Sequence, residues 1–147
     1  QGGSILTQSL LNAMLEKIEA NGLYTLEDFQ MEFEKYMMFT FAAPSGSRYP
    51  GIDSFDMQIE SGCTILATHY LMASEKVDER MLKKLNEIIK RIEPPEEFDE
   101  LEGYDIEIDE DGPSLEVNCT AQYIDDLPSL KIISKLIQGI LKKAGIE

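Results

Sequence analysis

The chain has few of the residues from which metal centres and catalytic triads are built. Its 147 residues include one histidine, His69, and two cysteines, Cys63 and Cys119. One histidine excludes a multi-histidine metal site, and the cysteines are too far apart in sequence to form a closely spaced zinc-binding pair. Gly-rich phosphate loops, nucleophile elbows and dinucleotide fingerprints are also missing. We therefore expect no cofactor, no resident metal and no catalytic residue that can be named.

Long apolar runs are missing as well. No segment approaches the roughly 20 apolar residues that a membrane-spanning helix needs, and no export signal is visible at the start. Residues 1–4, Gln-Gly-Gly-Ser, resemble the remnant of an expression tag, so we expect one α+β domain over residues 5–147. Two cysteines in a domain of this size favour free thiols in a reducing compartment, and hence a cytoplasmic location.

Lys and Arg do not occur between residues 92 and 130, a segment that holds 14 Asp or Glu. The other residues carry 14 acids and 13 bases, so this segment supplies almost all of the formal net charge of −15. Such a charge argues against nucleic acid and anionic membranes as partners, because phosphate binding relies on Lys and Arg. We expect a basic protein partner, although net charge can also serve solubility alone. The oligomeric state is left open.

Apolar residues recur at helical spacing in four places. The predicted helices cover residues 5–20, residues 25–38, the segment from a cap at Asp78 to Pro94, and the segment from a cap at Asp125 or Asp126 to Gly145. In the last of these, Pro128 is expected in the first turn. Residues 39–54 contain Pro, Gly and Ser and are predicted to form a long loop.

Alternating polarity predicts strands elsewhere. Phe55, Met57 and Ile59 alternate with polar residues, and residues 104–109 and 115–120 flank Asp111-Gly112 as a hairpin. Residues 64–72 are ambiguous: a tight Ser61-Gly62 turn would make them a strand, but they could also continue as a buried helix, and we favour the strand. The expected order is α-α-β-β-α-β-β-α. It describes an α+β fold with an antiparallel sheet of two hairpins and about four helices, mainly packed on one face.

The hairpin predicts an acidic surface, because its outward positions and the residues before it are carboxylates. Together with two contact residues at the tip of the long loop, the candidate partner-binding residues are Glu96, Glu97, Asp99, Glu100, Glu102, Asp105, Glu107, Asp109, Asp111, Arg48 and Tyr49. Our first hypothesis is therefore a small inhibitor or immunity protein, antitoxin-like, that neutralises a basic partner such as a nuclease toxin.

Four alternatives remain at this stage. Glu107, Asp109, Asp111 and Gly112 partly match a calcium loop, but the match fails at Asn118, where a bidentate Glu is required. A carboxylate enzyme, with or without a divalent ion, requires two converging acids in a deep pocket. A Cys–His pair is conceivable, but His69 and both cysteines fit packing roles better. The fourth alternative is a structural subunit of a homo-oligomer.

Overall fold

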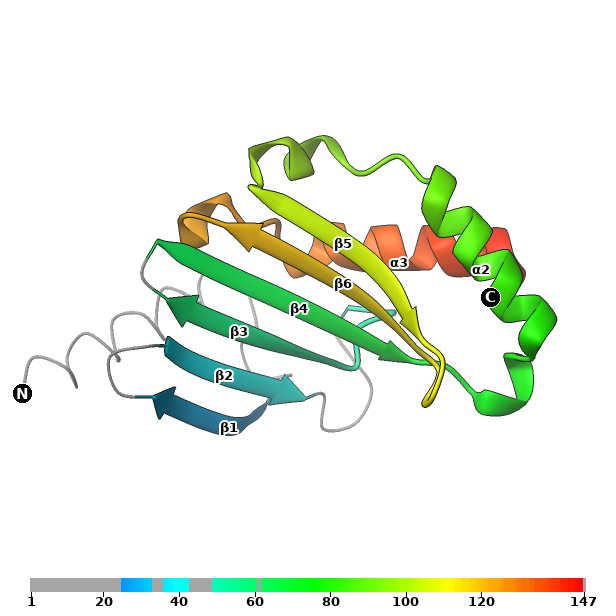
Figure 1. Cartoon of the computed structure of the whole chain (residues 1–147), viewed down its shortest axis with the longest axis horizontal. Coiled ribbons are helices and arrows are strands. Elements are labelled where there is room, and N and C mark those ends of the chain that lie inside the picture. The colour runs from blue at the N-terminus through cyan, green and yellow to red at the C-terminus, as the bar shows by residue number, and fades with distance from the viewer. Residues whose placement is uncertain (1–24, 33–35, 43–48, 61, 147) are drawn as a thin grey trace, which may run out of the picture.

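The computed structural model describes residues 25–32, 36–42, 49–60 and 62–146, and these residues form one antiparallel sheet with helices beside it (Figure 1). The elements, in chain order, are β1 Thr25–Glu32, β2 Tyr36–Ala42, β3 Ser54–Glu60, β4 Cys63–Leu71, η1 Ser74–Lys76, α2 Glu79–Arg91, η2 Glu96–Glu100, β5 Gly103–Asp109, β6 Ser114–Ala121, η3 Ile124–Asp126 and α3 Leu130–Ala144. The strands lie in the order β1-β2-β3-β4-β6-β5. Every neighbouring pair is antiparallel.

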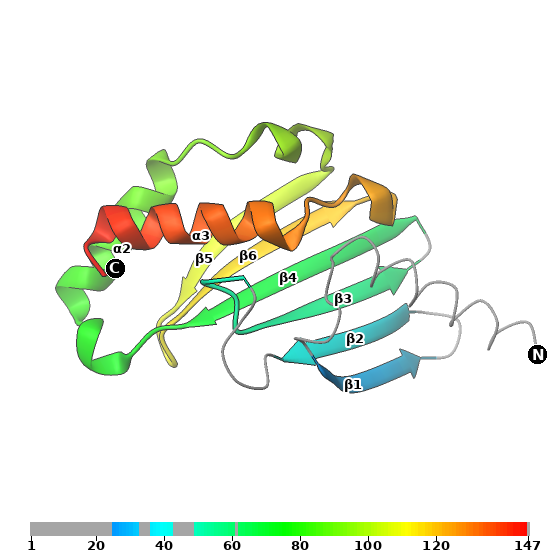
Figure 2. The same ribbon diagram turned by 180° about the vertical axis from the view of Figure 1, so that it is seen from behind.

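The core lies on the face of the sheet that α3 covers (Figure 2). Cross-strand partners share a face, so Phe41, Phe55 and Thr68 follow one another across β2, β3 and β4 on this side. The rings of Phe41 and Phe55 stack with centroids 4.8 Å apart. From α3, the side chains of Ile133, Ile137 and Ile140 are fully buried. Burying apolar side chains of this size contributes roughly 1.5–3 kcal/mol each, so this interface is a main source of stability.

The predicted number and order of helices are wrong. Within the helix predicted over residues 25–38, residues 25–32 form β1 and residues 36–38 begin β2, and β2 extends through residues 39–42, which were predicted to lie in a loop. The sheet accordingly contains β1 and β2 in addition to the two predicted hairpins. Among the described residues α2 and α3 are the two α-helices, and the helix predicted over residues 5–20 lies outside them. The antiparallel sheet and its β3–β4 and β5–β6 hairpins were correctly predicted.

The two helices begin and end at identifiable signals. Asp78 caps α2, its Oδ1 accepting a hydrogen bond from Met81 N at 2.9 Å, as predicted. The cap of α3 is Ser129 and not Asp125 or Asp126, which lie in η3, so Pro128 precedes the helix instead of lying in its first turn. Gly145 ends α3 in the left-handed conformation. No helix among the described residues is both long and apolar enough to cross a bilayer.

The segment 49–53 fixes the position of α3 over the sheet. Its backbone connects to β4, because Asp53 N donates to His69 O at 2.8 Å. It also reaches α3, where the buried hydroxyl of Ser134 donates to the carbonyl of Pro50. Tyr49 and Ile52 are part of the hydrophobic core. This segment therefore ties the β3–β4 hairpin to α3.

Candidate functional site

The face of the sheet opposite α3, called here the outer face, carries the alternate residues of each strand. Its central rows are defined by register: Thr40, Asp56, Ala67, Asn118 and Asp105 form one row, and Ala42, Ser54, His69, Glu116 and Glu107 form the next. None of the six described strands contains Lys or Arg. His69 is therefore the only side chain of these strands that can carry a positive charge near neutral pH.

His69 lies between carboxylates from two neighbouring strands. Its Nε2 is 2.9 Å from Oδ2 of Asp56 on β3, and its Nδ1 is 3.8 Å from Oε1 of Glu116 on β6. Asp56 is held in turn by Thr40 on β2, whose hydroxyl donates to Oδ1 at 2.8 Å. The His69, Asp56 and Glu116 side chains are 29%, 33% and 21% exposed. This cluster connects four adjacent strands through partly buried charges.

The protonation states of the cluster follow from these contacts. The hydrogen bond to Asp56 raises the pKa of His69, and the charges of Asp56 and Glu116 act in the same direction, while partial burial opposes them. The same hydrogen bond lowers the pKa of Asp56, helped by Thr40 and opposed by burial. Both shifts stabilise the charged pair, an imidazolium beside a carboxylate. When it is protonated, His69 offsets part of the negative charge at the centre of the outer face.

Towards β5 the carboxylates of the outer face have no such counterion among the described residues. Asp105, Glu107 and Asp109 are exposed and occupy alternate positions along β5. Glu107 lies directly opposite Glu116 on the neighbouring strand β6. A hydrogen bond shared with Asp105 raises the pKa of Glu107, and repulsion from Asp105, Glu116 and Asp109 raises it further. This part of the face holds unrelieved repulsion that a cation from another molecule would lower.

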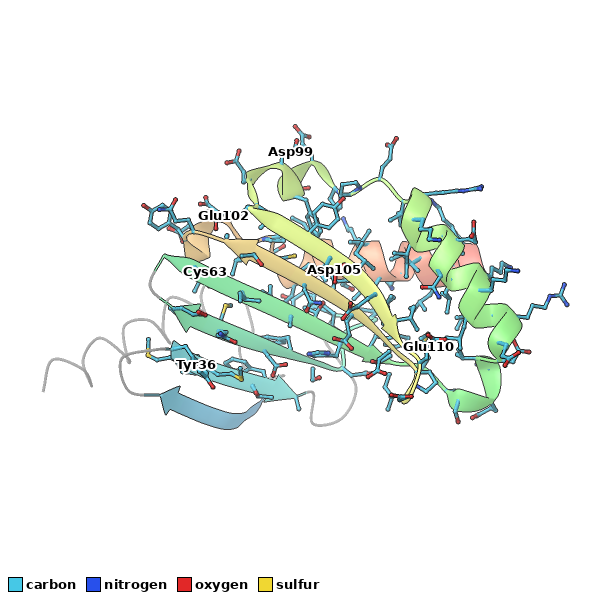
Figure 3. The ribbon with its side chains drawn as sticks, in the orientation of Figure 1. Tyr36, Cys63, Asp99, Glu102, Asp105 and Glu110 are labelled. Carbon is cyan, nitrogen blue, oxygen red and sulfur yellow. The ribbon has the colours of Figure 1, made fainter. Side chains whose placement is uncertain are left out.

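The structure separates the predicted binding residues into two groups, as Figure 3 shows for Asp99 and Asp105. Asp105, Glu107 and Asp109 lie on the outer face. Glu96, Glu97, Asp99 and Glu100 lie on η2, which is anchored on the core side because Phe98 is buried against Tyr104, with ring centroids 5.2 Å apart. Glu102 precedes β5 and Asp111 lies in the hairpin turn, both exposed. One continuous acidic surface is therefore not formed.

Of the two predicted loop contacts, Tyr49 joins neither group. Tyr49 is 7% exposed and lies in the core, so its side chain is not available to a partner. Arg48 lies outside the described residues.

Sequence reasoning missed His69, Asp56 and Glu116 as site residues. His69 occurs in a run of mostly apolar residues, which favoured a packing role. One signal was available, since a two-residue Ser61-Gly62 turn pairs Glu60 with Cys63 and therefore Ser54 with His69. That register brings His69 diagonally opposite Asp56 on the same face.

The geometry limits the chemistry of this cluster. Both ring nitrogens of His69 face carboxylates, and Cys63 lies six residues away on the same strand, roughly 20 Å at about 3.3 Å per residue. Cys119 faces the core, where burial raises the pKa of its thiol to about 12. Neither cysteine can therefore form a nucleophile–base pair with His69. Within the described part of the chain, no three His, Cys, Asp or Glu side chains are placed to hold a metal ion.

A comparison with protein-family models finds no match, and a comparison with curated proteins finds none either. Two solved structures are similar in outline. YbjN from E. coli, a proposed transcription regulator, is 8% identical with a TM-score of 0.38, over 95% of this chain and 86% of that chain. An uncharacterized protein from Methanothermobacter thermautotrophicus is 11% identical with a TM-score of 0.42, over 92% and 90%. Likeness at this level carries no conclusion about function.

Proposed function

We propose that this chain is a binding protein whose outer face covers a basic surface of another protein. One observation carries the proposal: the described strands expose Asp105, Glu107 and Asp109 beside Glu116, and Lys and Arg are missing from these strands. Lys or Arg side chains from a partner would relieve the repulsion that Asp105, Glu116 and Asp109 exert on Glu107. Complementary charge of this kind raises association rates and selects partners.

The His69 cluster supports binding by keeping the face rigid. Its contacts cross from β2 to β6 and hold Asp56 and Glu116 in place before a partner arrives. Pre-organised side chains lose less conformational entropy when they bind. The exposed carboxylates of β5 then contact the partner, and Asp56 and Glu116 help to hold the strands of the outer face in place.

The finer form of the proposal is an inhibitor of the immunity or antitoxin type. Its partner would be a protein with a cationic active site, such as a nuclease toxin, and charge and size motivate this choice. A nucleic-acid-binding site needs clustered Lys and Arg, which an acidic sheet face can cover. We place the protein in the cytoplasm in this account, where the free thiols of Cys63 and Cys119 stay reduced.

Capture from a lysate of the source organism tests the proposal. The immobilised natural chain is compared with D105N/E107Q, changed on the outer face, and with E96Q/E97Q, changed by the same charge on η2. We expect a basic protein to be retained by the natural chain and by E96Q/E97Q, released by added salt, and lost by D105N/E107Q. Equal retention by all three proteins, or retention of no basic protein, would contradict the proposal.

A further inference from the structure

The surface formed by α2 and α3 is basic, although the chain as a whole is strongly acidic. The two helices carry nine Lys or Arg and only two acids, Glu79 and Glu87, and all nine basic residues are exposed. Among the described residues, Arg91 alone of the nine forms an ion pair, with Glu87 at 3.8 Å. The molecule therefore has an acidic sheet face and a basic helical surface.

Helix stability does not explain this basic surface. Lys and Arg in a last helical turn complement the helix dipole, which accounts for Lys90, Arg91, Lys142 and Lys143. Arg80 and Lys131, however, lie in the first turns of α2 and α3, where a positive charge is unfavourable. The first turn of α3 contains no acid at all. The helix dipole therefore does not account for the bases outside the last turns, and they add to the positive charge of the surface around the two helix ends.

A groove of 240 Å³ lies within this surface, between the two helices. It is lined by Glu87, Ile88 and Arg91 of α2 and by Lys143 of α3. Arg91, paired with Glu87 at 3.8 Å, and Lys143, which has no ion pair among the described residues, supply the cations, while the partly buried Ile88 supplies an apolar wall. Such a lining fits a carboxylate on a short aliphatic stem, that is, an Asp or Glu side chain of a protruding segment.

The chain itself carries a segment of this kind. The tip of the β5–β6 hairpin presents Asp109, Glu110 and Asp111, all exposed, and Figure 3 shows Glu110 at the far end of the hairpin. The tip is ordered locally, because Asp111 N donates to Oδ1 of Asp109 at 3.1 Å. We propose that this hairpin tip of one copy docks into the α2–α3 groove of a second copy.

This contact joins two different surfaces, so it is heterologous and leads to chains of molecules unless a ring closes. A net charge of −15 opposes the approach of two copies. At an ionic strength of about 0.15 M the Debye length is about 8 Å, so repulsion between distant charges is screened more strongly than attraction between groups in contact. A hairpin tip covers a small area, and the association is accordingly weak and seen only at high protein concentration.

Sedimentation velocity over a range of protein concentrations tests the proposal. The natural chain should sediment faster as its concentration rises in buffer of about 0.15 M ionic strength. R91Q/K143Q, which removes two charges at the groove, should remain monomeric. R80Q/K131Q removes the same charge from the same two helices. Its positions lie about 16–18 Å along the helix axes from Arg91 and Lys143, at 1.5 Å per residue, so this variant should still associate.

A mixing experiment identifies the occupant of the groove. D109N/E110Q/D111N lacks the acidic tip and should be monomeric alone, like R91Q/K143Q. Mixed together, the two variants retain one intact tip and one intact groove. They should therefore form heterodimers, but not the extended chains of molecules that the natural protein can form.

The proposal is overturned if the natural protein stays monomeric. This holds even if its groove then binds an acidic peptide of another protein. Association that survives in either variant alone overturns it too. Neither Arg91 nor Lys143 belongs to the outer face, so failure here leaves the proposed function untouched.

Discussion

At the scale of single residues, His69 is the side chain on which the outer face depends. It is the one histidine of the chain, and it lies between Asp56 and Glu116 with both ring nitrogens directed at carboxylates. Without its charge, two partly buried carboxylates would lack their counterion. We therefore regard His69 as the structural centre of the acidic face and the exposed acids of β5 as its contacts.

The raised pKa of His69 predicts how stability depends on pH. The unfolded histidine titrates near 6.5, and the folded one titrates above this value. The contribution of its charged contacts is therefore fully present below about pH 6.5 and is lost as pH rises through the folded pKa. We expect a loss of about 1 kcal/mol in the free energy of unfolding, measured by urea titration across this window. H69Q should lack this pH-dependent step, and a natural chain whose stability is constant or rises there would refute the assignment.

At the scale of elements, the turn before β3 packs closely against α3. Gly51 has φ of 90°, and a Cβ at this position would lie 2.8 Å from Cγ2 of Ile137 on α3. Gly62, in the β3–β4 turn, also has positive φ, at 74°, but a Cβ there would meet no atom within 4 Å. The two glycines thus both have positive φ and differ in how closely α3 approaches.

We predict that G51A is the more damaging of two matched changes. G62A should cost about 1 kcal/mol in the free energy of unfolding, because only backbone strain opposes it. G51A adds overpacking against Ile137 and should cost about 2–4 kcal/mol. Chemical unfolding of both variants measures the difference. Equal losses would mean that α3 does not lie over this turn as described.

The strands that sequence reasoning found are those whose own residues alternate in polarity. Tyr104, Ile106 and Ile108 alternate with acids, and that hairpin is present. In contrast, Tyr36 and Met37 fit the spacing of a helix as well as that of a strand. What selects the strand is packing of Phe39 and Phe41 against residues of β3, a pairing that a local pattern does not contain.

The candidate site was predicted only in part for a related reason. Strand alternation was sufficient to place Asp105, Glu107 and Asp109 on one face. It could not show that η2 lies apart from them, because the anchoring of Phe98 beside Tyr104 is a tertiary contact. In β4, Cys63–Leu71, polar and apolar residues do not alternate, so the face on which His69 lies is set by pairing with β3.

At the scale of the whole molecule, charge is separated between the strands and the α-helices. Among the described strands no Lys or Arg occurs, whereas α2 and α3 carry nine. This separation gives the chain a dipole that can orient an approaching basic partner towards the sheet. The cost is repulsion among the carboxylates of the outer face, which adds to the effect of the Asp105 hydrogen bond in raising the pKa of Glu107.

Relief of that repulsion should be measurable in the free protein. We predict that E107Q raises the melting temperature in low salt, because it removes a charge repelled by Asp105, Asp109 and Glu116. Added salt should raise the melting temperature of the natural chain and reduce the difference between the two proteins. E97Q, on η2, serves as the control of equal charge change. A natural chain with higher melting temperature than E107Q in low salt would contradict this account.

The central claim, that the outer face is the surface that receives cations from a partner, is tested most directly by NMR. A short Lys- and Arg-rich peptide would be titrated into isotopically labelled protein, and backbone amide shifts followed along the chain. We predict that the shifts are centred on Asp105, Glu107 and Glu116 and are lost in D105N/E107Q. Shifts centred on η2, from Glu96 to Glu100, or shifts of equal size in both proteins, would contradict the claim.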